Sequence, residues 1–257
     1  MVQLKTATKT NNNYYLVMEF CNGGDLGEFI KFRGGHLQES DARVILRQIV
    51  KGLQAIRVKK VMHRDLKLPN ILLNLPGVSA QEFISPSFNL QNMMRGIKLT
   101  GPNAVNLEVK IADLGFAREL EEEDLASTRL GTPLIMAPET LAGQKFDHSV
   151  DVWSLGCVFY EMLTGYSPFT GTSQLNLHEN IVKGDYKFPK TVKFSLQGLS
   201  FLNMCLQFDP KKRPSIFELA SHPYLQLDEL ETSKQEDLFL SFHPDSRKFV
   251  PDKFENG

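Results

Sequence analysis

The residues that could perform chemistry are concentrated at positions 63–70, where the sequence is His-Arg-Asp-Leu-Lys-Leu-Pro-Asn. This stretch brings a carboxylate (Asp65), an amine (Lys67) and an amide (Asn70) within eight residues, and the apolar run 71–73 follows directly. A carboxylate can accept a proton, an amine supplies positive charge, and carboxylate and amide oxygens are suitable ligands for Mg²⁺. The pattern predicts a catalytic loop.

The segments around this loop predict the elements that position it. Apolar residues at three-to-four spacing predict a helix over 40–57, with Ser40 or a neighbour as its cap. The run that ends at Leu73 and the segment that begins at Leu107 predict two strands after the loop. The loop is therefore expected between a long helix and two strands.

The first 35 residues predict strands followed by a short helix. Residues 14–20 form a β-branched and aromatic run with turn residues at both ends, and residues 2–4 are expected to pair with them. Taken alone, this pattern also fits a plain hairpin that binds no ligand. Residues 25–32 predict a short amphipathic helix ended by the glycines at 34–35.

Residues 75–106 are rich in glycine and proline and lack periodicity, so we interpret them as an insertion. One interpretation is a mobile loop with no role in catalysis. The other is a docking loop built on the apolar residues Phe83, Phe88, Met93 and Met94.

The second half of the chain predicts a mainly helical unit. Residues 151–165 have the length and apolarity of a central buried helix, and further helices fit 175–183, 196–207 and 216–221. The most apolar stretch is shorter than the roughly 20 residues that cross a bilayer, so no transmembrane segment is expected. Residues 226–257 are interpreted as a polar tail.

Composition limits the class of protein. The chain has 257 residues, of which 42% are hydrophobic, and a net charge of −1. These values predict a soluble globular protein and disfavour a broad nucleic-acid surface. Cys21, Cys157 and Cys205 are too few and scattered for a disulfide framework or a zinc site, so a reducing compartment, the cytoplasm, is expected.

Three motifs in one order resemble the eukaryotic-type serine/threonine protein kinases. They are the stretch 63–70, Asp113-Leu-Gly and Ala137-Pro-Glu, and the resemblance covers residues 1–225. The sequences of residues 15–26, 109–118 and 136–139 are similar to those of the autophagy-initiating kinase family. Such a kinase would act on Ser or Thr in protein substrates and would have proteins of the autophagy complex as partners.

This resemblance implies an α+β, protein-kinase-like fold. Residues 1–20 would be a remnant of the amino-terminal β-sheet lobe, namely its last strands and the start of the hinge. Residues 21–225 would be the helical carboxyl-terminal lobe, interrupted by the insertion 75–106, and residues 226–257 would follow as the tail.

The resemblance also implies the roles of residues that transfer the γ-phosphoryl group of ATP. Asp65 would accept the proton of the substrate hydroxyl and Lys67 would face the transferring phosphate. Asn70 and Asp113 would hold Mg²⁺ through hard oxygen ligands. Thr132 matches the residue type found in kinases specific for serine and threonine.

Other matching positions would bind the nucleotide. In the family pattern, Met18 is the gatekeeper, and the backbone from Glu19 to Cys21 is the hinge that meets adenine. Asp25 would contact the ribose, and Leu72 would form the apolar floor under adenine.

A last group of matching residues would regulate or brace the site. Arg64 could pair with a phosphate on Thr128, which would add about −1.5 to −2 charges. Glu139 and Arg213 match a structural ion pair, and Asp151 matches a buried acid that braces the catalytic loop.

The sequence departs from an ordinary active kinase in its first residues. It contains no Gly-x-Gly-x-x-Gly loop, no Val-Ala-x-Lys strand and no glutamate-bearing helix before the hinge. We therefore expect weak nucleotide affinity, a large rate loss and an exposed apolar face for this chain alone, and we interpret it as a fragment or an incomplete gene model. Leu114, where the family has Phe, is expected to be tolerated. Leu68-Pro69 and Ile135 predict a substrate preference that is not basic.

Two alternatives to catalysis follow. The chain could be a catalytically impaired, pseudokinase-like scaffold that binds protein partners through its helical lobe. An unrelated nucleotide-binding or structural domain is the remaining alternative.

Overall fold

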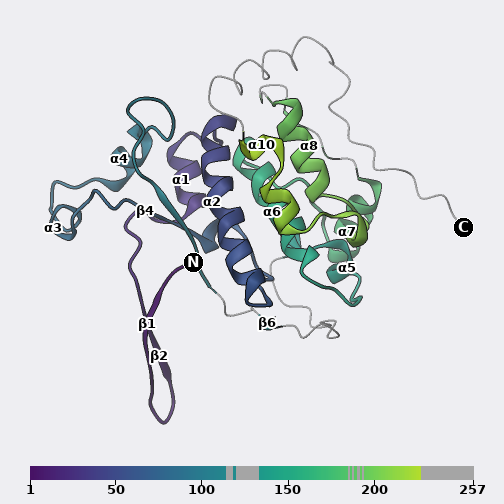
Figure 1. The fold of residues 1–257 in the computed structure, drawn as a ribbon, viewed down its shortest axis with the longest axis horizontal. Coiled ribbons are helices and arrows are strands. Elements are labelled where there is room, and N and C mark those ends of the chain that lie inside the picture. The colour runs from purple at the N-terminus through teal and green to yellow at the C-terminus, as the bar shows by residue number, and fades with distance from the viewer. Residues whose placement is uncertain are drawn as a thin grey trace, which may run out of the picture.

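The computed structural model describes residues 1–113, 118–119, 133–184, 186, 188–189, 192 and 194–226. Within these residues, a helical body carries a long hairpin and a separate arm at one side (Figure 1). The body contains α2, α6 and α8, the hairpin is β1 with β2, and the arm contains α3 and α4. The small two-stranded sheets and numerous helices confirm an α+β fold of the kinase type with a reduced β-sheet lobe.

The helices and strands have the following bounds. The helices are α1 (Leu26–Phe32), α2 (Glu39–Val58), α3 (Ala80–Phe83), α4 (Leu90–Gly96), α5 (Pro138–Leu141), α6 (Ser149–Thr164), α7 (Gln174–Lys183), α8 (Leu196–Cys205), α9 (Ile216–Ala220) and α10 (Pro223–Gln226). Short 3₁₀ helices are η1 (Leu68–Asn70), η3 (Pro133–Ile135) and η4 (Pro210–Lys212). The strands are β1 (Leu4–Lys9), β2 (Tyr14–Met18), β3 (Val61–Met62), β4 (Ile71–Asn74), β5 (Glu108–Ile111) and β6 (Arg118–Glu119). Antiparallel pairs join β1 to β2, β3 to β6, and β4 to β5.

Helix α6 is the central buried helix that the apolar run predicts, although it begins two residues earlier, at Ser149. A helix that is apolar on all sides is stable only when it is surrounded by other elements. Phe159, near its middle, contacts the rings of Phe194, Phe201 and Tyr224. The helix ends at Gly165, whose φ of 77° and close approach to a backbone carbonyl leave no room for a side chain.

Helix α2 is one residue longer at each end than its apolar spacing predicts, and the expected local cap is wrong. Ser40 lies inside the first turn, and the residue before the helix, Gln38, makes no capping hydrogen bond through its side chain. Instead, the carboxylate of Glu39 accepts hydrogen bonds from Ser195 Oγ at 2.7 Å and Ser195 N at 2.8 Å. The Glu39 side chain therefore joins the start of α2 to the start of α8 and does not cap α2.

The insertion 75–106 is not the structureless loop that its lack of periodicity predicts. It contains α3 and α4, which are too short to show a helical repeat in the sequence. Met94 on α4 is fully buried, and α4 packs against α1. Met94 therefore belongs to the core and is not available for docking.

No helix in the described part of the chain is both long enough and apolar enough to cross a membrane.

Candidate active site

The predicted catalytic loop lies between β3 and β4, with Asp65 almost fully buried at its centre. The backbone N–H of Asp65 donates to Nδ1 of His63 at 3.3 Å, so Nδ1 must be the unprotonated nitrogen. Nε2 of the same ring donates to the carbonyl of Ala112 at 2.9 Å. The buried imidazole of His63 thus connects Asp65 to the residue that precedes Asp113.

The side chains of Lys67 and Asn70 both reach the Asp65 carboxylate. Lys67 Nζ lies 2.7 Å from Asp65 Oδ2, and Asn70 Nδ2 lies 3.1 Å from the same oxygen. Asn70 Nδ2 also donates to the Asp65 carbonyl at 2.8 Å. Because the amide nitrogen faces Asp65, the amide oxygen of Asn70 is directed away from it. The acid, amine and amide therefore form one cluster.

The carboxylate of Asp151 holds the backbone of this loop. Its Oδ2 accepts from the N–H of His63 at 2.8 Å, and its Oδ1 accepts from the N–H of Arg64 at 2.9 Å. Burial raises the pKa of the Asp151 carboxyl, and the two amide hydrogen bonds act in the opposite direction. Arg64 adopts a left-handed φ of 67°, so the bracing occurs at a strained turn. The brace expected of Asp151 is confirmed.

The two residues predicted to bind metal follow from one strand pair. Ile71 pairs with Ile111, and the next ladder bond joins the N–H of Ala112 to the carbonyl of Asn70 at 2.8 Å. The ladder therefore ends at Asn70 on one strand and at the residue before Asp113 on the other. Asp113 is exposed and has a φ of 60°. One amide and one carboxylate oxygen suit Mg²⁺, which takes its other ligands from phosphate and water. The described residues contain no group of three or more His, Cys, Asp or Glu side chains that could hold a metal ion by itself.

The predicted hinge runs beside β4. The N–H of Gly23 donates to the Leu73 carbonyl at 2.8 Å, and the N–H of Leu73 donates to the Gly24 carbonyl at 2.9 Å. Asp25 also forms a β-bridge with Leu72. A Cβ at Gly23 would lie 2.8 Å from the Leu73 carbonyl oxygen, so this close approach requires glycine. Leu72 and Asp25 are thereby placed side by side.

A family model described as the protein kinase domain matches residues 1–225. This chain belongs to the protein kinase family. It is 34% identical over 227 residues to the serine/threonine-protein kinase ATG1c of Arabidopsis thaliana. The aligned region covers 88% of this chain and 27% of ATG1c. The chain is also 34% identical over 235 residues to ULK3 of Mus musculus (91% of this chain, 44% of the relative) and 35% identical over 215 residues to ULK1 of Homo sapiens (83% and 18%). The predicted resemblance to the autophagy-initiating serine/threonine kinases is confirmed, and the chain spans less than half the length of these relatives.

The hinge residues of this kinase differ in how far they are enclosed. Cys21 is buried, and burial raises the pKa of its thiol. The carboxylate of Glu19 lies 2.6 Å from Lys110 Nζ, which holds the pKa of Glu19 below its usual value. Met18, at the predicted gatekeeper position, is in contrast 52% exposed. Asp25 has a structural role as well, because its Oδ1 caps α1 through the N–H of Glu28 at 2.9 Å.

The insertion contacts the kinase hinge, which the sequence did not indicate. Asn22 Nδ2 donates to the Leu75 carbonyl at 3.1 Å, and Asn22 Oδ1 accepts from the Leu75 N–H at 2.7 Å. The ring of Phe20 meets the ring of Phe83 at 5.3 Å, and Phe83 meets Phe88 at 5.2 Å. Two of the residues suggested for docking therefore pack beside the hinge.

The predicted structural ion pair is present and buried. Arg213 Nη1 and Nη2 lie 2.6 and 2.8 Å from the two carboxylate oxygens of Glu139. Arg213 also donates to the carbonyls of Gln207 and Phe208, at 2.7 and 3.1 Å. This bidentate geometry satisfies both charges inside the body.

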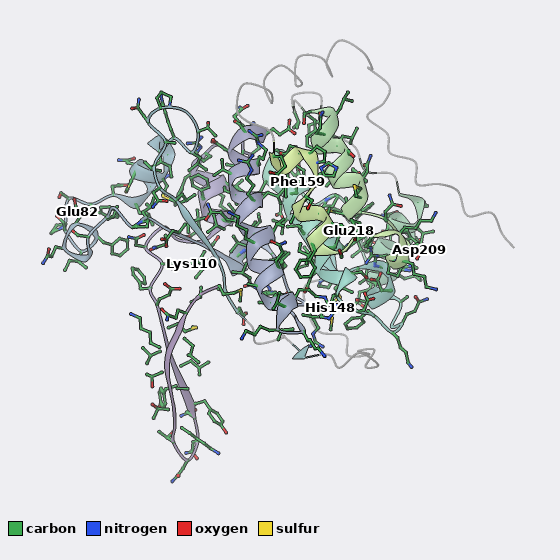
Figure 2. The ribbon with its side chains drawn as sticks, viewed as in Figure 1. Glu82, Lys110, His148, Phe159, Asp209 and Glu218 are labelled. Carbon is green, nitrogen blue, oxygen red and sulfur yellow. The ribbon has the colours of Figure 1, made fainter. Side chains whose placement is uncertain are left out.

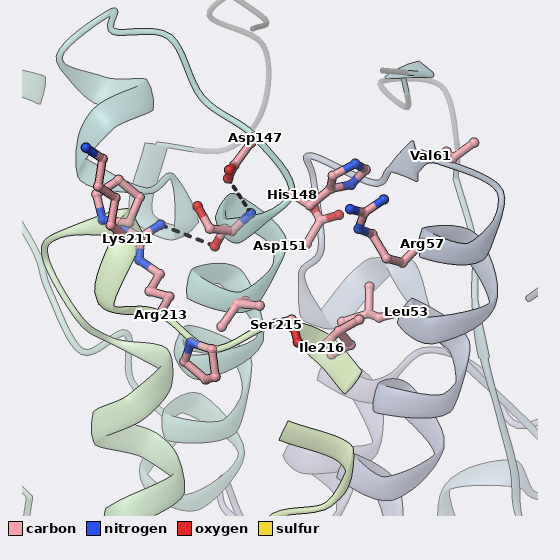
Figure 3. A pocket seen from close by; sticks show the side chains of 14 residues that line it. Leu53, Arg57, Val61, Asp147, His148, Asp151, Lys211, Arg213, Ser215 and Ile216 are labelled. Carbon is pink, nitrogen blue, oxygen red and sulfur yellow. Dashed lines mark hydrogen bonds between the residues drawn. The ribbon is translucent and has the colours of Figure 1, made fainter. Parts of the chain in front are cut away.

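A cavity of about 300 Å³ lies next to Asp151, between α2 and the start of α6 (Figure 3). Asp151 is part of its wall, together with apolar residues such as Leu53 and Ile216. Figure 3 shows the side chains of Arg57 and His148 at one end. Burial and the nearby charge of Arg57 lower the pKa of His148 to about 4, so its imidazole is neutral at pH 7.

Thr128, Thr132 and Leu114 lie outside the residues that the structure describes. The pairing of Arg64 with a phosphate on Thr128, the role of Thr132 and the tolerance of Leu114 therefore stay predictions.

Proposed function

We propose that this chain carries the phosphoryl-transfer machinery of a serine/threonine protein kinase. The observation that carries the proposal is the cluster in which Lys67 and Asn70 both contact the carboxylate of Asp65. Such a cluster can orient a substrate hydroxyl and offset charge at the same point, which is most of what phosphoryl transfer requires of a protein.

In this proposal, Asp65 accepts a hydrogen bond from the hydroxyl group of a Ser or Thr substrate and takes up its proton. The amide of Asn70 holds the Asp65 carboxylate, and the imidazole of His63 holds the backbone of Asp65. Lys67 carries three N–H donors, so it can contact Asp65 and a phosphate oxygen together. Bound ATP supplies the phosphoryl group, and Mg²⁺ offsets part of its charge.

Asn70 and Asp113 would hold the metal, since both lie where the β4–β5 ladder ends. Leu72 would support adenine, Asp25 would contact the ribose, and the backbone from Glu19 to Cys21 would bind the adenine edge. The β-bridge between Asp25 and Leu72 supports the roles given to these two residues.

We also propose that residues 1–20 act as the last part of the amino-terminal lobe and that the substrates are proteins of autophagy initiation in the cytoplasm. The similarity to ATG1 and ULK kinases supports this placement. Leu68 and Ile135 are both buried, so neither adds a charged contact for a basic substrate. A peptide-library screen that selected arginine strongly would contradict the expected preference.

The test is phosphate transfer to a generic protein by this chain and by the longest transcript product that contains it. Asp65→Asn should lower kcat by about 10²- to 10⁴-fold, because the base is lost while the hydrogen-bonding shape is kept. Calorimetry of Mg²⁺–ATP binding and circular dichroism should show that the variant still binds and folds.

The second candidate is a scaffold that binds protein partners without catalysis. The exposed position of Met18 favours it. Lack of both transfer and Mg²⁺–ATP binding in the two proteins would support the scaffold and reject the kinase proposal.

A further inference from the structure

A groove of about 660 Å³ lies between the end of α1 and the end of α4. Its lining comes from two segments far apart in the sequence, residues 31–34 and 95–98. Four of the eight lining residues are cations and none is acidic; they are Lys31, Arg33, Arg95 and Lys98. The insertion therefore adds one wall of a basic groove to the helical body.

Buried contacts hold the two walls together. Arg33 Nη1 donates to the carbonyl of Ile97 at 2.6 Å, and Arg33 Nη2 lies 2.6 Å from Asp41 Oδ2. On the opposite wall, the side chains of Met94 and Ile97 enter the core. These contacts fix the two walls of the groove relative to each other.

The other three cations are exposed and have no ion-pair partner in the part of the chain that the structure describes. Lys31 lies in the last turn of α1, Arg95 lies in the last turn of α4, and Lys98 follows α4. Like charges around one groove repel each other, so an anionic ligand would be attracted to it and would relieve this repulsion.

The floor of the groove suits an extended chain. Phe32 provides apolar surface, and Gly34 and Gly96 expose backbone. A Cβ at either glycine would meet no atom within 4 Å, so there is room for a ligand directly above them. Apolar contacts and accessible backbone favour a peptide over a small inorganic anion.

We propose that this groove binds an acidic, extended segment of a protein substrate. The use in substrate recruitment rests on the proposed kinase function, whereas the binding itself does not. The groove is short and the whole chain has a net charge of −1, which disfavours a nucleic acid as the ligand.

The binding test uses fluorescence anisotropy with a labelled peptide of about ten residues that alternates Glu with Leu and Ser. Each exposed cation is expected to change the affinity by about 1.5- to 5-fold. The triple variant Lys31→Glu, Arg95→Glu, Lys98→Glu should therefore weaken binding by about 3- to 100-fold. Binding by the unaltered chain should also weaken as NaCl is raised, because salt screens exposed charges.

A matched charge control reverses three exposed lysines outside the groove, Lys51, Lys145 and Lys183. It changes the net charge by the same amount and should leave peptide affinity within about twofold of the unaltered chain. Equal losses in the two triple variants would mean that only net charge matters, and would overturn the proposal.

A steric test needs no change of charge. Gly96→Leu places a side chain in the groove where no atom obstructs it, so binding should be lost while the fold is retained. Gly77→Leu, at another glycine whose Cβ would meet no atom within 4 Å, is its control and should bind normally. Normal binding by Gly96→Leu, or equally tight binding of a neutral peptide or of an oligonucleotide of the same charge, would also overturn the proposal.

Binding and catalysis are separable in these experiments. Asp65→Asn should bind the acidic peptide as the unaltered chain does. In the transfer assay, the groove triple variant should raise KM for a substrate that carries an acidic segment and leave kcat for a short neutral substrate unchanged. Peptide binding without any phosphate transfer would support the groove and reject the proposed kinase activity.

Discussion

The helical body and the β1–β2 hairpin use apolar residues in opposite ways. In the body, 14 of the 16 residues of α6 are buried. In the hairpin, every residue of both strands is exposed, including Tyr15 and Val17. The hairpin projects away from the body, and its side chains lie along a free ribbon (Figure 2).

The candidate site therefore has one part in the packed body and another part on the exposed hairpin. Asp65, Lys67 and Asn70 lie in the body, where Asp151 and His63 hold the loop. The hairpin joins the body near its base, through hydrogen bonds such as that from Val2 N to Ile111 O at 2.8 Å. An isolated two-stranded hairpin is only marginally stable in water. The phosphoryl-transfer side of the site is therefore expected to keep its geometry better than the gatekeeper side.

The largest contrast is expected between a core aromatic residue and a hairpin residue. Phe159→Ala should lower the free energy of unfolding by about 3–5 kcal/mol, because a cavity replaces a ring that contacts three others. Val17→Ala should change it by less than about 0.5 kcal/mol, since its side chain is exposed. Urea denaturation followed by circular dichroism measures both. Similar losses would contradict the division between body and hairpin.

Two ion pairs provide a second contrast. Arg213→Met leaves the Glu139 carboxylate buried without its partner and should cost about 3–5 kcal/mol. Lys110→Met breaks the contact of the hinge residue Glu19, but both side chains are about one-fifth exposed, so about 0.2–1 kcal/mol is expected. Chemical denaturation of the two single variants gives the comparison, and an equal cost would show that the Glu139 site accepts water.

The junction between hinge and body can be tested with two glycines. Gly23→Ala places a methyl group 2.8 Å from the Leu73 carbonyl oxygen and should cost about 1–3 kcal/mol through overpacking. Gly77→Ala meets no atom within 4 Å and should change stability by less than about 0.5 kcal/mol. Thermal unfolding should separate the two variants, and an unchanged Gly23→Ala protein would show that the hinge can move away from β4.

The last contrast concerns pH and the half-buried side chain of His148. Its pKa is lowered from 6.5 to about 4, so the unfolded chain binds a proton between these values that the folded chain does not. The free energy of unfolding should therefore fall as pH decreases from about 6.5 to about 4. His148→Gln should reduce this dependence, measured as the difference in urea midpoint between pH 7 and pH 5. His36→Gln, at an exposed position, is the control, and an unaltered pH dependence in His148→Gln would contradict the lowered pKa.

The catalytic loop, the long helix α2 and the buried helix α6 were predictable because their signals are local. Residues 63–70 carry their chemistry within one short stretch, and helical periodicity depends only on neighbouring positions. The ion pair of Glu139 with Arg213 was also predictable, but only through the resemblance to kinases. The contact of the Glu39 carboxylate with Ser195 was not, because it joins two segments far apart in the sequence.

The sequence by itself thus determined the kinase family, the order of its motifs and the helices of its body. The tertiary structure decided how the insertion packs, since α4 is too short for a periodic signal and is held by its contact with α1. It also decided that residues 31–34 and 95–98 form one basic groove and that the apolar strands of the hairpin are exposed. Each of these features depends on contacts between residues far apart in the chain, or on the absence of such contacts among the described residues, and no local pattern records them.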